Sequence, residues 1–326
     1  MMHVPARDIP VPTSVSPQAQ AMLARGPLGP APVWPPLDDP DAWRAAIAAM
    51  DASSLTMLGS LAEGFVTDPS AADLTEIDVD GVAVYVVTPN GLDPDDRRVF
   101  LDIHGGAWVL GGGKVCRTLA PGRAAAVGAR VWAVDYRMPP DHPHPTPLDD
   151  CLAAYRALLA DHRPEDIVVG GQSAGGTFAT ALMLRARDEG LPLPAALVLD
   201  TPAVDLTASG DSLNTNLGVD TVLTGRADAP MRLYAGDHDL RDPYVSPLFG
   251  DFAKGFPPTI LLTGTRDLLL SDTVRLHARL RAAGQTAELH VFEAAGHGNF
   301  LGMAPEDQER AGEVRRFIDR AWAAGR

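Results

Sequence analysis

A serine held between glycines is the first residue in this sequence that could do covalent chemistry. Ser173 lies in GGQSAGG, residues 170–176, directly after the apolar run IVV and directly before a helical stretch. A strand, a sharp turn and a helix in that order make a nucleophile elbow, where glycines are needed because the turn is strained and crowded. The alternative is a glycine-rich turn that binds phosphate or only packs closely, and no Walker pattern supports it. We therefore expect Ser173 to be a nucleophile.

A nucleophilic serine needs a base and a carboxylate that orients the base. His297 lies in AAGHGNF, on a loop that follows the last strand candidate, and the alternative for it is an unrelated surface histidine. Its ordinary pKa of about 6.5 suits a general base near neutral pH. The stretch TILLTGTRDLLLSD offers Asp267 and then Asp272 after the preceding strand candidate. We favour Asp267, because Asp272 is expected to lie within the next helix and to point elsewhere.

The chain order Ser173, Asp267, His297 predicts acyl transfer through a covalent intermediate. In this hypothesis His297 takes the proton of Ser173 as the hydroxyl attacks a carbonyl, and Asp267 fixes the imidazole tautomer. Water then hydrolyses the acyl-enzyme. This chemistry requires no cofactor, and we expect none and no metal.

Two glycines earlier in the chain could bind the negative charge that such a reaction creates. The sequence HGGAW, residues 104–108, follows the strand candidate VFLDI. Glycines there would let backbone N–H groups approach a tetrahedral oxyanion. We expect Gly105 and Gly106, together with the N–H of Ala174, to form an oxyanion hole. His104 precedes the nucleophile, so we assign it a supporting hydrogen bond to the glycine loop.

The elements that must position these residues are visible as alternating apolar and helical stretches. Strand candidates are TEIDV and VAVYVV, then VFLDI, VWAVDY, IVVGG, ALVLD, TILLTG and AELHVF. Asp80 and Gly81 separate the first two and predict a tight hairpin turn. The rest of the alternation predicts βα units and a mainly parallel sheet. Helices are expected over 41–50, 147–160 and 174–187.

Two stretches interrupt this alternation and are expected to form a cap over the site. One is a proline-rich N-terminal arm, and the other is a long polar insertion. The predicted division is 1–65 arm and first part of the cap, 66–204 first part of the catalytic core, 205–230 cap insertion, and 231–326 second part of the core. The cap should control substrate size and do little for the chemistry. Trp108 and Phe300 are the predicted substrate contacts, although packing under the cap is the plainer role for Trp108.

Composition narrows the range of partners. The 27 basic and 42 acidic residues give a formal net charge of −15, so neither nucleic acid nor anionic lipid is an expected partner. Cys116 and Cys151 cannot form a disulfide framework, and no Cys and His stand at zinc-ligand spacing. The sequence lacks a bilayer-spanning apolar run and a signal-like N-terminus, so we expect a cytoplasmic protein without membrane insertion. A small-molecule ester is the expected partner, with a homodimer left open.

With these motifs in view, the chain resembles the hormone-sensitive-lipase-like esterases from about Ile77 to its end. Besides HGG and GQSAGG, three stretches match: VDYRMPPDHPHPTPLDD at 134–150, DPYVSPL at 242–248, and the pairing of GTRD with GHGNF. The resemblance implies an α/β-hydrolase fold with a mostly parallel eight-stranded sheet flanked by helices, a helical cap, and carboxylesterase activity. The chain departs from the family at Gln172, where Asp is usual, and at Ala107, where a third glycine is usual.

Other functions remain compatible with the same motifs. A lactonase or deacetylase specific for one metabolite is the alternative within enzymes, because cap residues determine both substrate pockets. A ligand-binding protein of this fold is the alternative outside enzymes, since a plant hormone receptor keeps the serine and lacks the histidine. His297 argues against that alternative here.

Overall fold

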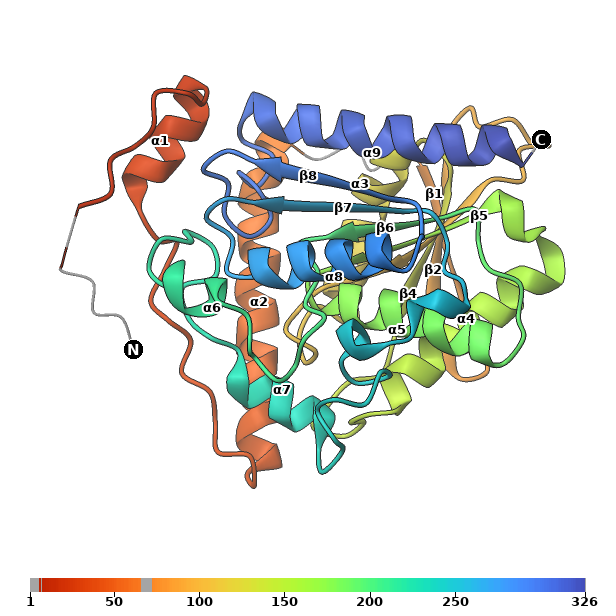
Figure 1. Ribbon diagram of the computed structural model, residues 1–326, viewed down its shortest axis with the longest axis horizontal. Coiled ribbons are helices and arrows are strands. Elements are labelled where there is room, and N and C mark those ends of the chain that lie inside the picture. Colours follow the sequence, from red (N-terminus) through yellow and green to blue (C-terminus); the bar gives the residue numbers. More distant parts are fainter. Residues whose placement is uncertain (1–5, 7, 66–71, 326) are drawn as a thin grey trace.

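The computed structural model describes residues 6, 8–65 and 72–325, and its centre is a single eight-stranded sheet. The strand order is β1-β2-β4-β3-β5-β6-β7-β8 (Figure 1). Only the β1–β2 and β2–β4 pairs are antiparallel, and the remaining neighbours run parallel. The predicted mostly parallel α/β-hydrolase sheet is confirmed.

The sheet begins with the hairpin predicted at Asp80 and Gly81. Strands β1, Ala72–Val79, and β2, Val82–Pro89, pair in register around these two residues. Asp80 and Gly81 both have positive φ, 52° and 83°, which is the conformation of a type I′ turn. Its twist matches that of the flanking strands, so the chain returns directly into the second strand.

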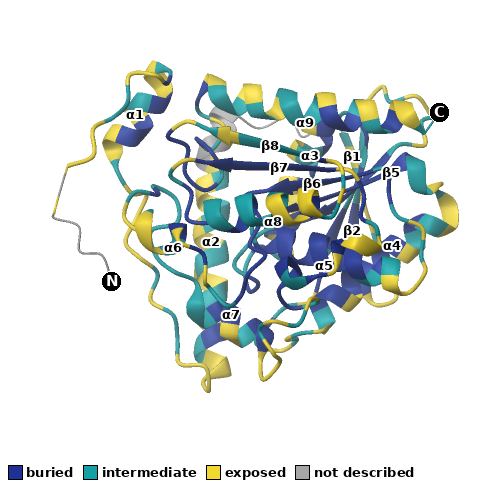
Figure 2. Ribbon diagram, in the orientation of Figure 1, coloured by how far each residue is buried: buried dark blue, intermediate teal, exposed yellow. Residues whose placement is uncertain are grey.

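The other strands are short runs rich in apolar residues, and those at the centre of the sheet are buried on both faces. They are β3 (Val99–Ile103), β4 (Arg130–Asp135), β5 (Ile167–Gln172), β6 (Ala196–Asp200), β7 (Thr259–Gly264) and β8 (Ala287–Phe292). Every residue of β3, β6 and β7 is buried, as Figure 2 shows in dark blue for the centre of the sheet. Continuous apolar sequence is expected for parallel strands that helices cover on both sides.

Helices form a layer on each face of this sheet. They are α3 (Lys114–Val127), α4 (Thr146–Asp161), α5 (Ala174–Asp188), α8 (Leu270–Ala282) and α9 (Pro305–Ala324). Successive strand residues point to opposite faces. Accordingly, Leu101 and Ile103 pack in a core with residues of α4, α5 and α8, whereas Phe100 packs in a second core with α3 and α9.

The remaining helices belong to the two segments that interrupt the βα pattern. They are α1 (Pro17–Arg25), α2 (Pro40–Phe65), α6 (Ser212–Thr215) and α7 (Asp228–Ala235). The helix predicted over 41–50 is therefore too short. The Ser53 and Ser54 side chains each donate to the carbonyl four residues earlier, and the helix continues through them. Residues 1–5 and 7 of the predicted arm lie outside the described residues, and so does the start of the predicted core at 66–71.

None of the described helices combines the length and the apolar character that crossing a bilayer requires.

Candidate active site

The serine predicted as nucleophile occupies a strained turn between β5 and α5. Ser173 has φ 54° and ψ −121°, a left-handed conformation that few side chains adopt. Its N–H donates to the Asp200 carbonyl at 2.9 Å, which fixes the turn to β6. A Cβ at Gly171 would lie 2.3 Å from the Gly175 carbonyl oxygen, and one at Gly175 would lie 2.1 Å from that of Ile103. Close packing therefore requires both glycines of the G-x-S-x-G pattern.

The structure brings His297 and Asp267 together, although 30 positions separate them in the sequence. His297 Nδ1 lies 3.2 Å from Asp267 Oδ1, and both side chains are buried. Asp267 also accepts from the Thr263 hydroxyl at 2.8 Å and from the Leu269 N–H at 2.9 Å, so its carboxylate is held from three directions. Burial lowers the pKa of His297, but its bond to Asp267 and the nearby negative charges outweigh burial and raise the pKa above 6.5.

Ser173 and His297 line one cavity of about 400 Å³. Its walls include Trp34 from the arm and Leu223 from the insertion. Within the described part of the chain the Ser173 hydroxyl makes no hydrogen bond. The bond to the histidine that proton transfer needs would thus form or tighten when substrate binds, as is common in unliganded enzymes.

The glycine loop after β3 lies against the nucleophile. A Cβ at Gly105 would lie 3.1 Å from Ser173 Cβ, and Gly106 has φ 133°, which suits only glycine. Both residues line the cavity. Ala174 is the first residue of α5, where a backbone N–H has no acceptor within the helix. Ala107, where the family pattern has glycine, takes φ 50°, so its side chain is tolerated at a cost of about 1 kcal/mol.

His104 supports this loop as expected. Its Nδ1 lies 2.8 Å from the Gly105 carbonyl oxygen, and its ring stacks on Tyr136 with centroids 4.2 Å apart. The Tyr136 hydroxyl donates to the His104 carbonyl at 2.7 Å. Burial lowers the pKa of His104, so the ring is neutral near pH 7.

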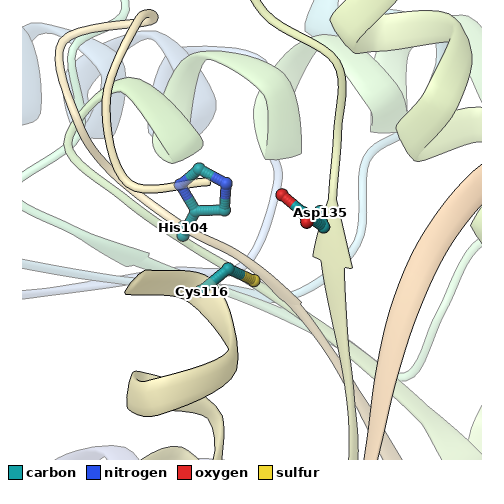
Figure 3. A group of neighbouring side chains, drawn as sticks. All are labelled: His104, Cys116 and Asp135. Carbon is teal, nitrogen blue, oxygen red and sulfur yellow. The ribbon is translucent and has the colours of Figure 1, made fainter. Parts of the chain in front are cut away.

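One group of side chains has the chemistry of metal ligands. Within the described residues, His104, Cys116 and Asp135 each place a donor atom within 4.8 Å of the others (Figure 3). A tetrahedral zinc ion with bonds of about 2.0–2.3 Å holds its ligand atoms roughly 3.3–3.8 Å apart. Asp135 already accepts from the Gly113 N–H at 2.8 Å and from the Tyr85 hydroxyl at 3.2 Å. These hydrogen bonds give Asp135 a structural role in holding the loop at Gly113.

The two aromatic residues predicted to contact substrate lie in different places. Trp108 lines the cavity, and its indole N–H donates to the Thr177 hydroxyl at 3.1 Å. Phe300 does not line the cavity. It is buried in a small apolar cluster with Val15 and Leu23 of the arm. The prediction for Phe300 is wrong because α1 covers the loop that follows His297, a contact across nearly the whole chain.

This placement predicts a loss of stability for Phe300→Ala and little change in substrate binding. Truncating a fully buried phenylalanine lowers the free energy of unfolding by about 3 to 5 kcal/mol. Urea denaturation would measure it, and the KM for p-nitrophenyl acetate should stay close to that of the parent. A KM that rises severalfold, in a variant whose stability is unchanged, would indicate that Phe300 does contact the substrate.

Asp272, the alternative acid, lies in α8, and its carboxylate binds backbone N–H groups of another loop. It accepts from the N–H groups of Val204 and Asp205 at 2.8 and 2.9 Å. Burial raises its pKa to about 7.

A second buried carboxylate near the proposed base, that of Asp220, was not predicted from the sequence. It comes from the insertion, is fully buried, and accepts from the His297 N–H. No local pattern marks its link to the proposed triad, because Leu268 and His297 lie 48 and 77 positions away.

Comparison with known proteins shows that the chain is similar to α/β-hydrolase esterases. A family model described as the α/β-hydrolase fold matches residues 100–301. Among curated proteins, an esterase of Acinetobacter venetianus is 34% identical over 228 residues, covering 68% of this chain and 74% of that protein. A putative acetyl-hydrolase, LipR, of Mycobacterium tuberculosis is 30% identical over 249 residues, covering 76% and 80%.

Solved structures agree over almost the full length. The crystal structure of one esterase matches with a TM-score of 0.87 and 36% identity, and covers 98% of each chain. That of an esterase described as a member of the bacterial hormone-sensitive lipase family matches with a TM-score of 0.78 and 31% identity, covering 94% of this chain and 99% of the other.

Proposed function

The chain belongs to the hormone-sensitive-lipase-like group of the α/β-hydrolase family, and from that premise we propose that it cleaves short- to medium-chain acyl esters through Ser173, His297 and Asp267. The protein is a serine carboxylesterase by its family and its relatives. The proposal adds which residues act and which acyl chains fit.

One observation carries the assignment of residues. Three separate segments meet at one cavity: the elbow with Ser173, the loop with Gly105 and Gly106, and the loop with His297, which Asp267 contacts from behind. A nucleophile, donors for an oxyanion and an oriented base are the parts that ester hydrolysis needs.

The proposed reaction has two halves. In the first, His297 Nε2 takes the Ser173 proton while the hydroxyl oxygen attacks the ester carbonyl, and the Gly105, Gly106 and Ala174 N–H groups bind the oxyanion. Asp267 stabilises the imidazolium, which then gives its proton to the leaving alcohol. In the second half water replaces the alcohol, and the same groups release the acid.

We also propose that the arm and the insertion form a cap that limits acyl length. Pro32, Trp34 and Met50 line the cavity from the arm, and Leu213 and Leu223 line it from the insertion. A volume of about 400 Å³ is at the low end for ligand pockets, which favours short to medium chains.

Leu223→Ala should therefore extend the acyl range. Removing this wall side chain makes room for more methylenes, and each is worth about tenfold or more in discrimination. We expect kcat/KM for p-nitrophenyl decanoate, relative to the acetate, to rise about tenfold. Leu217→Ala is the matched control, because Leu217 belongs to the same insertion but is 46% exposed and does not line the cavity. An equal rise in both variants would contradict a wall role for Leu223.

A further inference from the structure

The buried carboxylate of Asp220 connects three segments around the proposed base. Its Oδ1 accepts from the N–H groups of Val222 and Leu223 at 2.9 and 3.1 Å, and its Oδ2 accepts from that of Leu268 at 3.0 Å. The N–H of His297 lies 3.2 Å from both oxygens. One side chain of the insertion thus holds the residue after Asp267 and the backbone of His297 itself.

Four backbone N–H groups surround the Asp220 side chain and favour its ionised, acceptor-only form. Both oxygens receive N–H donors from the backbone, so a proton on either oxygen would point at another proton. Burial and the charge of Asp267 raise the pKa of Asp220 above its ordinary value, although the charge of His297 and the backbone donors offset part of that effect. No Lys or Arg pairs with Asp220 in the part of the chain that the structure describes. The positive charge that His297 acquires in the proposed reaction therefore has no competing ion pair at Asp220 among the described residues.

The glycine before the base confirms how tightly the carboxylate fits. A Cβ at Gly296 would lie 2.7 Å from Asp220 Oδ1, closer than real contacts allow. Gly296 is thus needed because Asp220 occupies the space beside it. The first glycine of the G-H-G sequence consequently has a steric reason that the sequence alone does not reveal.

We propose that Asp220 is a positioning residue for the proposed triad, so that this inference rests on the proposed function. Its carboxylate fixes the loops of Asp267 and His297 relative to each other. Its charge stabilises the imidazolium that forms when Ser173 loses its proton. The expectation that the cap does little for the chemistry does not hold for Asp220, because the insertion supplies this group.

The proposal has a signature in the pH profile. The charged groups that face the His297 imidazole are Asp267, from the loop after β7, and Asp220, from the insertion. Both negative charges raise the pKa of His297, and only the neutral imidazole acts as base. Activity therefore falls as pH drops through that pKa. Removing the charge of Asp220 lowers the pKa of His297, so the acid limb of kcat/KM should move to lower pH.

Asp220→Asn is the principal test. Asn places an NH₂ group opposite the backbone N–H of Leu268 or His297, which pushes the two loops apart. A displacement of about 1 Å can cost a hundredfold, so we expect kcat for p-nitrophenyl butyrate to fall about tenfold to a hundredfold. The acid limb should move to lower pH at the same time.

Asp150→Asn is the matched control. Asp150 is another buried carboxylate that accepts a backbone N–H, that of Arg137 at 2.8 Å, and it lies outside the cavity. This variant should lose stability without moving the acid limb. Should Asp220→Asn not fold, Asp220→Ser removes the same charge with a smaller side chain and is expected to give the same two changes.

Two results would overturn the proposal. One is full kcat per folded molecule, counted by stoichiometric phosphonylation of the serine. The other is a loss of kcat with an unmoved acid limb, as for a purely structural residue. Ser173→Ala tests the triad separately: if that variant stays active the proposed function fails, whereas an inactive Ser173→Ala beside a fully active Asp220→Asn refutes only the role of Asp220.

Discussion

Ser173→Ala should abolish the hydrolysis of p-nitrophenyl butyrate and leave the fold intact. Loss of a triad nucleophile lowers kcat on the order of 10⁶-fold in serine hydrolases, because no other group can form the acyl-enzyme. The hydroxyl makes no hydrogen bond within the described structure, and alanine adopts the left-handed turn no worse than serine does. Initial rates and a thermal unfolding curve would measure the two effects.

Ser53→Ala is the control for this substitution. Ser53 is exposed on α2 and bonds only to the carbonyl of its own helix, so activity should match that of the parent. Turnover by Ser173→Ala within tenfold of the parent, after contaminating esterase is excluded, would show that the nucleophile lies elsewhere.

Asp267→Asn should cost about 10⁴-fold in kcat, far more than Asp272→Asn. An amide nitrogen facing His297 Nδ1 favours the wrong tautomer, in which Nε2 carries a proton and cannot act as base. Asp272 contacts no part of the proposed triad, and its pKa of about 7 means that the native fold already tolerates a neutral side chain there. Asn can still accept from the Val204 and Asp205 N–H groups with its one oxygen.

Comparing Asp267→Asn with Asp272→Asn tests which carboxylate orients His297. Asp272→Asn should keep most of its kcat and lose at most some stability, as urea denaturation would reveal. Equal losses of kcat in both variants, at equal folded fractions, would reject the choice of Asp267.

The features that the sequence predicts well are those with local causes. The strands are short apolar runs, and the hairpin depends on Asp80, Gly81 and their immediate neighbours. The elbow likewise depends on neighbours within a few positions, because Gly171 and Gly175 relieve contacts at the turn itself. Such patterns are readable in one sequence, so the sheet and the placement of Ser173 between β5 and α5 could be predicted.

The features that the sequence does not predict depend on contacts between distant segments. Phe300 was predicted as a substrate contact, yet it packs in a cluster with Val15 and Leu23. Asp220 lies in a polar insertion where nothing distinguishes it from the other acidic residues. Its role follows only from the distance to Leu268 and His297, which folding determines and spacing does not.

The docking of α1 also bears on how the protein can be attached to a surface or a fusion partner. Ser16, just before α1, donates through its N–H and hydroxyl to the Glu306 carboxylate at 2.7 and 2.8 Å, at the start of α9. From there α9 extends its 20 residues, about 30 Å, to the opposite end of the molecule (Figure 1). A linker joined after α9 leaves the loop of His297 undisturbed, whereas a bulky group joined close to α1 strains the contact that covers it.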